Sequence, residues 1–147
     1  MISPEQLRRY PFFCCISEEA LKEAAMISDE VIAEAGKTLF SEGDRAETMY
    51  ILVDGEVDIK YTLGNGEQRT IDTLVAGDIV VWSTLVEPHR CTANGVARGA
   101  CKLISINGPK LRELCEKNPD LGYRMLISVT QLLAARLDGA RVQLATV

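Results

Sequence analysis

The stretch AGDIVVWSTLVEPHRCTA, from Ala76 to Ala93, gathers residues that together could hold a small anion. A Gly-Asp turn leads into a short apolar run, and the single tryptophan of the chain, Trp82, then precedes the hydroxyl residues Ser83 and Thr84. Arg90 follows in the same stretch, and a guanidinium group presents a fork of N–H donors that suits a phosphate or a carboxylate. The segment therefore predicts a binding site for a small anionic ligand.

Catalytic and metal-binding patterns are absent from the sequence. The single histidine, His89, falls in the same stretch, and no serine stands in a G-x-S-x-G pattern. A glycine-rich phosphate loop of the nucleotide hydrolases is also missing. The five cysteines include no C-x-x-C pair, which zinc sites usually show. We therefore expect neither an enzyme nor a metal site.

The cysteines allow two interpretations. They are Cys14, Cys15, Cys91, Cys101 and Cys115. In the first interpretation all are reduced and pack as small hydrophobic residues, as is usual in cytosolic proteins. In the second, the adjacent pair Cys14 and Cys15 senses thiol chemistry or a metal.

The length and composition predict one soluble domain. The chain has 147 residues, of which 47% are hydrophobic and 25% charged, and this length can bury a sizeable core. Its 16 basic residues are scattered among 21 acidic ones, and the net charge is −5, which argues against broad binding to nucleic acid. No apolar run approaches the roughly 20 residues that cross a bilayer, and no secretory signal begins the chain. We expect a cytoplasmic location and no membrane contact.

Three regions of different periodicity must position the anion site. Helical spacing predicts helices within residues 1–29, and short β-rich runs that end in glycine turns follow over residues 30–107. Their regular spacing predicts an antiparallel barrel or sandwich. Asp54-Gly55 predicts a tight hairpin within it, and Gly64-Asn65-Gly66 predicts another turn. Helical spacing returns over residues 108–147.

Residues that favour helix starts precede the predicted helices. Ser3 and Ser17 stand before the two N-terminal helices, where a serine side chain can accept a free backbone N–H. Asn118 and then a proline predict the start of the last helix. That helix extends to about Leu144, although Gly139 weakens its end.

The last helix has apolar residues on two faces. One set, at spacings of three and four, is Leu126, Val129, Leu133, Leu137, Ala140 and Leu144. A second set beside it is Leu121, Met125, Leu132 and Ala135. Such a helix can pack against two partners, and the barrel of the same chain is one of them. The same helix of a second copy is the other candidate and would give a two-fold homodimer. The alternative is that the whole broad face packs within one chain.

The stretch GKTLFSEGDRAETMYILVDGEVDI, from Gly36 to Ile59, carries a fairly specific pattern. A glycine and an apolar pair precede Glu42-Gly43-Asp44, and Y-I-L-x-x-G-x-V follows with Gly55 and Val57 at its end. In this pattern the chain resembles the cyclic nucleotide-binding domain of catabolite-activator regulators, kinase regulatory subunits and gated channels. The resemblance covers nearly the whole chain. It implies a mainly β fold, a double-stranded β-helix (jelly-roll) barrel with N-terminal helices and a long C-terminal helix.

The resemblance also implies which residues meet the ligand. In nucleotide-binding members, a Gly-Asp turn precedes two apolar residues, a glycine, and a glutamate that binds the ribose. A short helical turn and an arginine for the cyclic phosphate come next. Arg90 and the small residue Cys91 fit this pattern, but Val81 replaces the glycine and Trp82 the glutamate. Tryptophan offers no acceptor, so it cannot replace the ribose partner. The candidate ligand-binding residues are Val81, Trp82, Ser83, Thr84, Arg90, Cys91 and Thr92.

Two functions of different kinds remain open. In one, the chain is a stand-alone regulatory sensor that binds a cyclic nucleotide (cAMP or cGMP) or another small anion and signals to an effector protein through its long helix. In the other, Val81 and Trp82 close the pocket, and the fold serves as a dimeric scaffold for protein interaction. An open cavity beside the Trp82 ring would favour the sensor, whereas a ring that fills the pocket would favour the scaffold.

The DNA-binding regulators of this family continue past the long helix into a helix-turn-helix domain. This chain ends at Val147, where such a domain would begin, and no other basic recognition helix is evident. We therefore expect no DNA binding by the chain itself.

Overall fold

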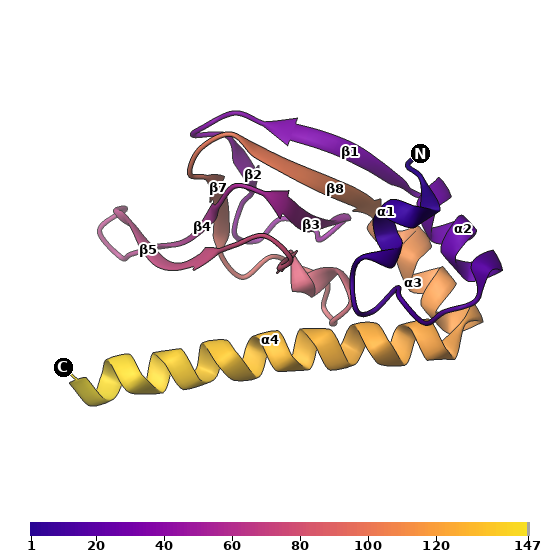
Figure 1. The fold of residues 1–147 in the computed structure, drawn as a ribbon. Helices are drawn as coiled ribbons and strands as arrows, with labels where there is room; N and C mark the ends of the chain where they lie inside the picture. Colours follow the sequence, from indigo (N-terminus) through magenta and orange to yellow (C-terminus); the bar gives the residue numbers. More distant parts are fainter. Residues whose placement is uncertain (147) are drawn as a thin grey trace.

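Two four-stranded antiparallel sheets pack against each other in the computed structural model, which describes residues 1–146 (Figure 1). The strand orders are β1-β8-β3-β6 and β2-β7-β4-β5. The strands are β1 (Ser28–Ala33), β2 (Thr38–Phe40), β3 (Thr48–Asp54), β4 (Val57–Thr62), β5 (Gln68–Leu74), β6 (Ile79–Val80), β7 (Asn94–Ala97) and β8 (Cys101–Asn107). The helices are α1 (Pro4–Arg8), α2 (Glu18–Met26), the 3₁₀ turn η1 (Trp82–Thr84), α3 (Gly108–Lys117) and α4 (Pro119–Thr146). The predicted jelly roll with N-terminal helices and a long C-terminal helix is confirmed.

Alternating side chains build the core between the sheets. In β4, Val57 and Ile59 are buried, while Asp58 and Lys60 beside them are half-exposed. Since neighbouring residues of a strand point to opposite faces, this alternation places one face of the sheet in the interior. Leu103 of the facing sheet is fully buried in the same cluster.

The Asp54-Gly55 turn passes the chain from one sheet to the other. β3 pairs with β6 and β8, whereas β4 pairs with β5 and β7, so no ladder joins β3 to β4. The predicted hairpin at this turn is therefore wrong. A glycine turn signal specifies a sharp change of direction but not the strand that the chain pairs with next. The Gly64-Asn65-Gly66 turn does close a hairpin, between β4 and β5.

Local hydrogen bonds fix the ends of the helices. The Ser3 and Ser17 side chains accept backbone N–H groups at the starts of α1 and α2, as predicted. Asn118 directly precedes α4, as predicted, and its carbonyl oxygen accepts the backbone N–H of Gly122 at 3.2 Å. Its side-chain amide donates to the carbonyl of Leu114 at 3.2 Å, so the side chain completes the end of α3.

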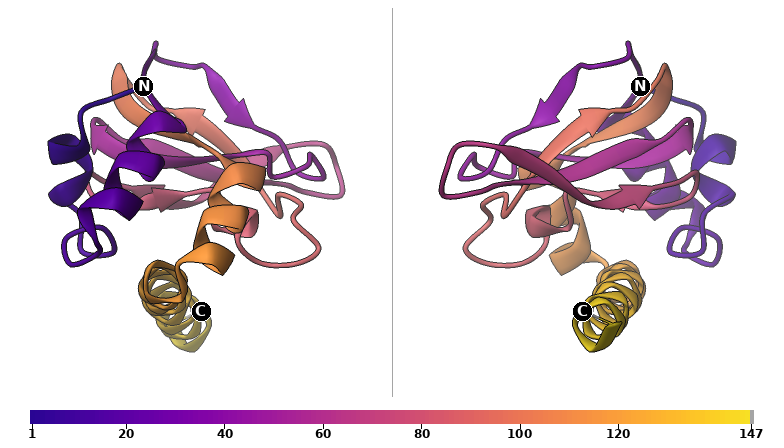
Figure 2. Two further views of the ribbon diagram at one scale, coloured as in Figure 1. Left: turned by 90° about the vertical axis from the view of Figure 1, so that its right-hand side faces the viewer. Right: turned by 90° about the vertical axis from the view of Figure 1, so that its left-hand side faces the viewer.

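Helix α4 runs as a long rod alongside the barrel (Figures 1 and 2). Leu121, Met125 and Val129 are buried against the rest of the chain. Leu137 and Leu144, which the sequence placed in the same stripe as Val129, are 53% and 77% exposed. One side of α4 is therefore buried against the rest of the chain, and a second apolar side is exposed to solvent. Among residues 1–146, no helix combines the length and the apolar character that crossing a membrane requires.

Candidate functional site

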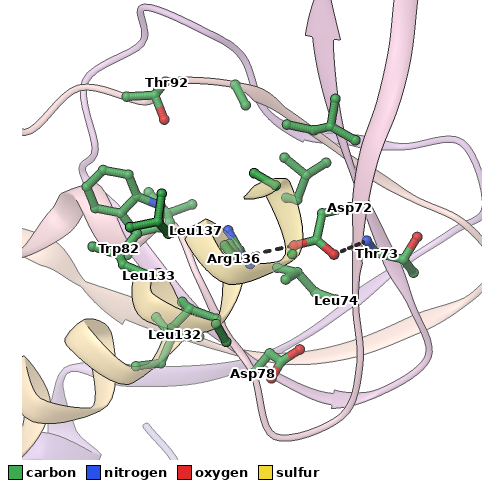
Figure 3. Close-up of a pocket in the computed structure, with 18 of the residues that line it drawn as sticks. Asp72, Thr73, Leu74, Asp78, Trp82, Thr92, Leu132, Leu133, Arg136 and Leu137 are labelled. Atoms are coloured by element: carbon green, nitrogen blue, oxygen red, sulfur yellow. Dashed lines mark hydrogen bonds and ion pairs between the residues drawn. The ribbon is translucent and has the colours of Figure 1, made fainter. Parts of the chain in front are cut away.

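A cavity of about 700 Å³ separates the barrel from the second half of α4 (Figure 3). This volume is in the range of small-molecule pockets, roughly 300–1,000 Å³. Much of its wall is apolar and includes Phe40, Ile59, Leu74, Leu132, Leu133 and Leu137. Its polar and charged lining includes Asp72, Thr73, Asp78, Ser83, Thr92 and Arg136. An apolar cavity with a few polar groups is the usual form of a small-molecule site.

The turn that precedes η1 sets the direction of Trp82. Val81 has φ 67° and ψ 61°, a left-handed conformation that strains a β-branched residue. The half-buried indole of Trp82 packs against the buried hydrophobic cluster that includes Phe13, Leu21 and Met125. Figure 3 shows the indole next to Leu133 and Leu137. The ring therefore forms part of the cavity wall and leaves the space beside it open.

Five of the seven predicted site residues line the cavity, namely Val81, Trp82, Ser83, Cys91 and Thr92. Thr84 does not, because its side chain is fully buried behind η1, next to Gly108. Its carbonyl oxygen accepts a hydrogen bond from Nη1 of Arg112 at 2.8 Å, which fastens η1 to α3. Its role in this structure is to position η1.

Arg90, the predicted phosphate partner, is also outside the cavity lining. Its exposed side chain donates from Nη1 to the carbonyl oxygen of Gly43 at 2.9 Å. Its backbone forms an isolated β-bridge with Arg45. His89, just before it, lies with Nδ1 3.2 Å from the carbonyl oxygen of Ser83. His89 and Arg90, near the end of the predicted anion-binding stretch, therefore contact neighbouring backbone and do not line the cavity.

Two charged cavity residues, Arg136 and Asp72, were not predicted from the sequence. Nε of Arg136, on α4, lies 3.2 Å from Oδ2 of Asp72, on β5 (Figure 3). Arg136 stands four and three residues after Leu132 and Leu133, so all three share one side of the helix. A basic residue within this apolar set was the available signal, because charged side chains on an apolar face usually have a partner.

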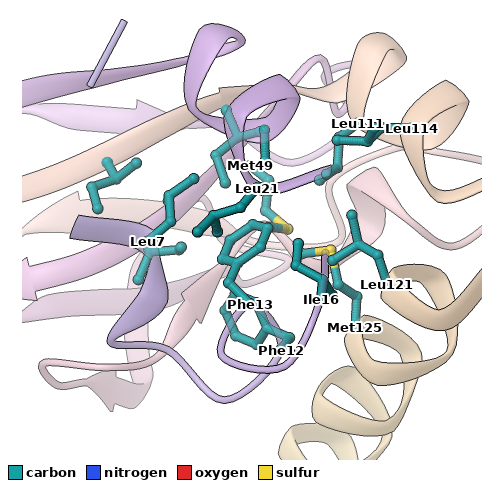
Figure 4. Close-up of a cluster of buried hydrophobic side chains, with 14 of the residues drawn as sticks. Leu7, Phe12, Phe13, Ile16, Leu21, Met49, Leu111, Leu114, Leu121 and Met125 are labelled. Carbon is teal, nitrogen blue, oxygen red and sulfur yellow. The ribbon is translucent and has the colours of Figure 1, made fainter. Parts of the chain in front are cut away.

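The first half of α4 is anchored firmly, which fixes where its second half meets the cavity. Leu121 and Met125 are fully buried in the same hydrophobic cluster, together with Phe13 and Leu21 of the N-terminal segment (Figure 4). Cys115, on α3, approaches Met125 with 3.9 Å between the sulfur atoms. Burial raises the pKa of the Cys115 thiol to about 11, so this thiol is neutral and packs as an apolar group.

The remaining cysteines separate by environment. Burial and then the nearby Asp44 carboxylate raise the pKa of Cys91. Cys14 and Cys15 are exposed, with 2.9 Å between their sulfur atoms, and the hydrogen bond to Cys15 is the main cause that raises the pKa of Cys14. Within residues 1–146, no three His, Cys, Asp or Glu side chains come together in a way that could hold a metal ion.

A family model described as the cyclic nucleotide-binding domain matches residues 30–118, which include the barrel, most of the cavity wall and α3. The chain belongs to the cyclic nucleotide-binding domain family. The resemblance inferred from the Gly36–Ile59 pattern is therefore confirmed.

Members of the cyclic nucleotide-binding domain family with known names or structures are similar over most of this chain. The cAMP-activated global transcriptional regulator CRP of Salmonella typhimurium (strain LT2) is 31% identical over 102 residues, which are 69% of this chain and 47% of that protein. The chain thus spans about half the length of that regulator.

Solved structures share the fold over the same region. A crystal structure of a candidate cyclic nucleotide-binding protein from Geobacter metallireducens GS-15 has a TM-score of 0.82 and 35% identity, and the match covers 93% of this chain and 99% of that one. The regulatory domain of Toxoplasma gondii PKA, crystallised with cAMP, has a TM-score of 0.66 and 24% identity over 76% of this chain and 42% of that one, a level at which only the fold is shared.

Proposed function

We propose that this domain is a regulatory sensor that binds a small anionic ligand, a cyclic nucleotide or a ligand of similar size and charge, in the cavity beside Trp82. One observation carries the proposal: α4 supplies one wall of the cavity, through residues such as Leu133 and Leu137. A ligand in that space contacts barrel and helix together. Its binding would therefore favour one arrangement of α4 on the barrel over others, which is how a non-catalytic sensor signals.

The cavity's own chemistry supports a ligand of this kind. Trp82 and Phe40 offer aromatic surface on which a flat ring can stack, and the hydroxyl groups of Thr73, Ser83 and Thr92 can bond to polar substituents. Family membership makes a cyclic nucleotide the first candidate, because the regulator that is 31% identical is named as cAMP-activated.

A homodimer through α4 completes the proposed sensor. Seven exposed positions follow one another at alternating spacings of four and three: Tyr123, Ile127, Thr130, Ala134, Leu137, Arg141 and Leu144. This is the heptad spacing of a two-stranded coiled coil. Tyr123 is 67% exposed and Ile127 41%, so pairing this face with its copy would remove apolar surface from water. An effector protein would then respond to the paired helices.

A thermal melt of the purified protein, with and without cyclic AMP or cyclic GMP at about millimolar concentration, tests ligand binding. A ligand present at about 100 times its dissociation constant adds about 2.7 kcal/mol to the free energy of unfolding, which raises the Tm by several degrees. Adenosine at the same concentration is the control without a phosphate. A rise in Tm with cyclic AMP or cyclic GMP, without a comparable rise with adenosine, supports the sensor.

The second candidate function is a dimeric interaction scaffold without a nucleotide. Two observations favour the scaffold. Arg90 donates a hydrogen bond to the carbonyl oxygen of Gly43, and Trp82 occupies the position of the family's ribose-binding glutamate. If neither nucleotide nor any other small anion changes the Tm while the protein remains a dimer, the scaffold is the better description.

A further inference from the structure

The guanidinium of Arg136 is incompletely satisfied in the cavity. Its Nε and Nη2 atoms are shielded from solvent, and neither has a hydrogen-bond partner within residues 1–146. Nε is 3.2 Å from Oδ2 of Asp72, so the charges are close, but the two groups do not meet in hydrogen-bonding geometry. Buried charged donors without an acceptor are costly, and an acceptor that reaches them is bound correspondingly well.

The two unpartnered atoms define what kind of acceptor would fit. Nε and Nη2 form one edge of the planar guanidinium. Once the neighbouring side chains that shield this edge move aside, it can bind two oxygens of a phosphate or a carboxylate at once. Arg136 is also the one basic residue among those that line the cavity in the described chain. Arg90, the other candidate, is bonded to Gly43 outside this lining.

The carboxylates in the cavity have partners of their own. Oδ1 of Asp72 accepts the backbone N–H of Thr73 at 2.8 Å, and Oδ2 of Asp78 accepts the backbone N–H of Val75 at 2.9 Å. Asp72 is also 39% exposed. Asp72 would therefore keep a hydrogen bond and contact with water if another anion took its place beside Arg136.

We propose that Arg136, rather than Arg90, anchors the anionic group of the ligand, and that the ligand displaces Asp72 from the guanidinium. This inference rests on the proposed sensor function and names the group that the site recognises, a phosphate or carboxylate attached to a flat ring. Arg136 belongs to α4 and Asp72 to β5, so the exchange replaces a direct tie between helix and barrel by one through the ligand. Occupancy is thus registered by the same helix that carries the dimer face.

Calorimetric titration of the whole chain tests the exchange. The probes are cyclic AMP, cyclic GMP, phenyl phosphate and benzoate, which separate phosphate from carboxylate recognition, and adenosine is the uncharged control. Two matched variants, Arg136→Gln and Arg90→Gln, each remove one positive charge, and Arg136→Lys keeps the charge but loses the fork. Melting curves verify that each variant is folded.

At least one anionic probe should bind the wild-type protein and adenosine should bind much more weakly. Arg136→Gln should raise the Kd of that probe about tenfold or more, and Arg136→Lys should raise it less. Arg90→Gln should change it by less than about threefold, and Asp72→Asn, which removes the competing anion, should lower it about threefold or more.

Two results would overturn the inference, and they differ in what they leave standing. Loss of binding in Arg90→Gln with unchanged binding in Arg136→Gln would show that the family's arginine anchors the ligand, and the sensor function would survive. Absence of binding by every anionic probe, in both the wild type and Asp72→Asn, would reject the anchor and the sensor function together.

Discussion

Gly55 and Ala100 meet where the chain twice passes from one sheet to the other. A β-carbon on Gly55 would stand 2.7 Å from the carbonyl oxygen of Ala100 and 3.0 Å from Cα of Cys101. The Cys101 thiol also donates to the carbonyl oxygen of Glu56 at 3.1 Å. The β3–β4 and β7–β8 corners are therefore fastened side by side, and the two sheets that frame the cavity are joined there.

Gly55→Ala should destabilise the protein by roughly 2–4 kcal/mol, from backbone strain and overpacking together. The residue has φ +96°, which an alanine adopts only with strain, and the clash is with backbone that cannot rotate away. Gly64→Ala is the matched control, because nothing lies within 4 Å of its added β-carbon and the change should stay within about 0.5 kcal/mol. Urea unfolding curves measure both, and equal midpoints for the two variants would contradict the close contact.

Val81 should show an inverted order of stability on truncation. At most buried sites glycine is less stable than alanine by roughly 0.5–1 kcal/mol. Val81 has φ 67° and is 7% exposed, so both substitutions lose its packing, but only glycine relieves the left-handed strain, worth roughly 1–2 kcal/mol. We therefore expect Val81→Gly to unfold at the same or a higher urea concentration than Val81→Ala. The usual order, with alanine clearly more stable, would show that no strain is stored there.

A charge in the proposed dimer face should separate the subunits. Ile127→Lys places two ammonium groups near each other across the two-fold axis, where apolar side chains would otherwise be buried. Sedimentation velocity at about 50 µM should show a dimer for the wild type and a monomer for this variant. Gln131→Lys adds the same charge at an exposed position that flanks the face, where a lysine can keep its ammonium group in water, and this variant should remain a dimer. A wild-type protein that sediments as a monomer would reject the face.

Thiol reactivity should divide the five cysteines into two groups. Cys14 and Cys15 are exposed, whereas Cys91 and Cys101 are buried and the pKa of Cys115 is raised to about 11. Because the thiolate is the reactive form, Cys115 should be almost inert at pH 8. Ellman's reagent should therefore release two equivalents rapidly from the native protein and five after denaturation.

The fast phase should also depend on pH in a defined direction. The hydrogen bond to Cys15 raises the pKa of Cys14, so its thiolate fraction, and its rate, should keep rising at higher pH than for an ordinary thiol. The double variant Cys14→Ser/Cys15→Ser should remove the fast phase entirely. A fast phase that persists in this variant would mean that one of the other three sites opens readily.

Much of the fold could be predicted from local signals. Serine caps, glycine turns and the alternation of Val57 and Ile59 each depend on a few neighbouring residues, so the sequence located the helices and strands and led to the family. The sequence located the Asp54-Gly55 turn, but it did not show that this turn leads from one sheet to the other. A turn changes the direction of the chain, whereas burial of both flanking strands decides which sheet each one joins.

The candidate site divides in the same way. The sequence by itself determined the segment around Trp82, because its spacing after the Gly77-Asp78 turn matches a family pattern. Only the tertiary structure decided that Arg90 bonds to Gly43 and that Arg136 meets Asp72 from the other side of the cavity. Each contact joins residues that are far apart in the chain, and side-chain direction across such distances depends on how sheets and helices pack, which no local pattern of residues encodes.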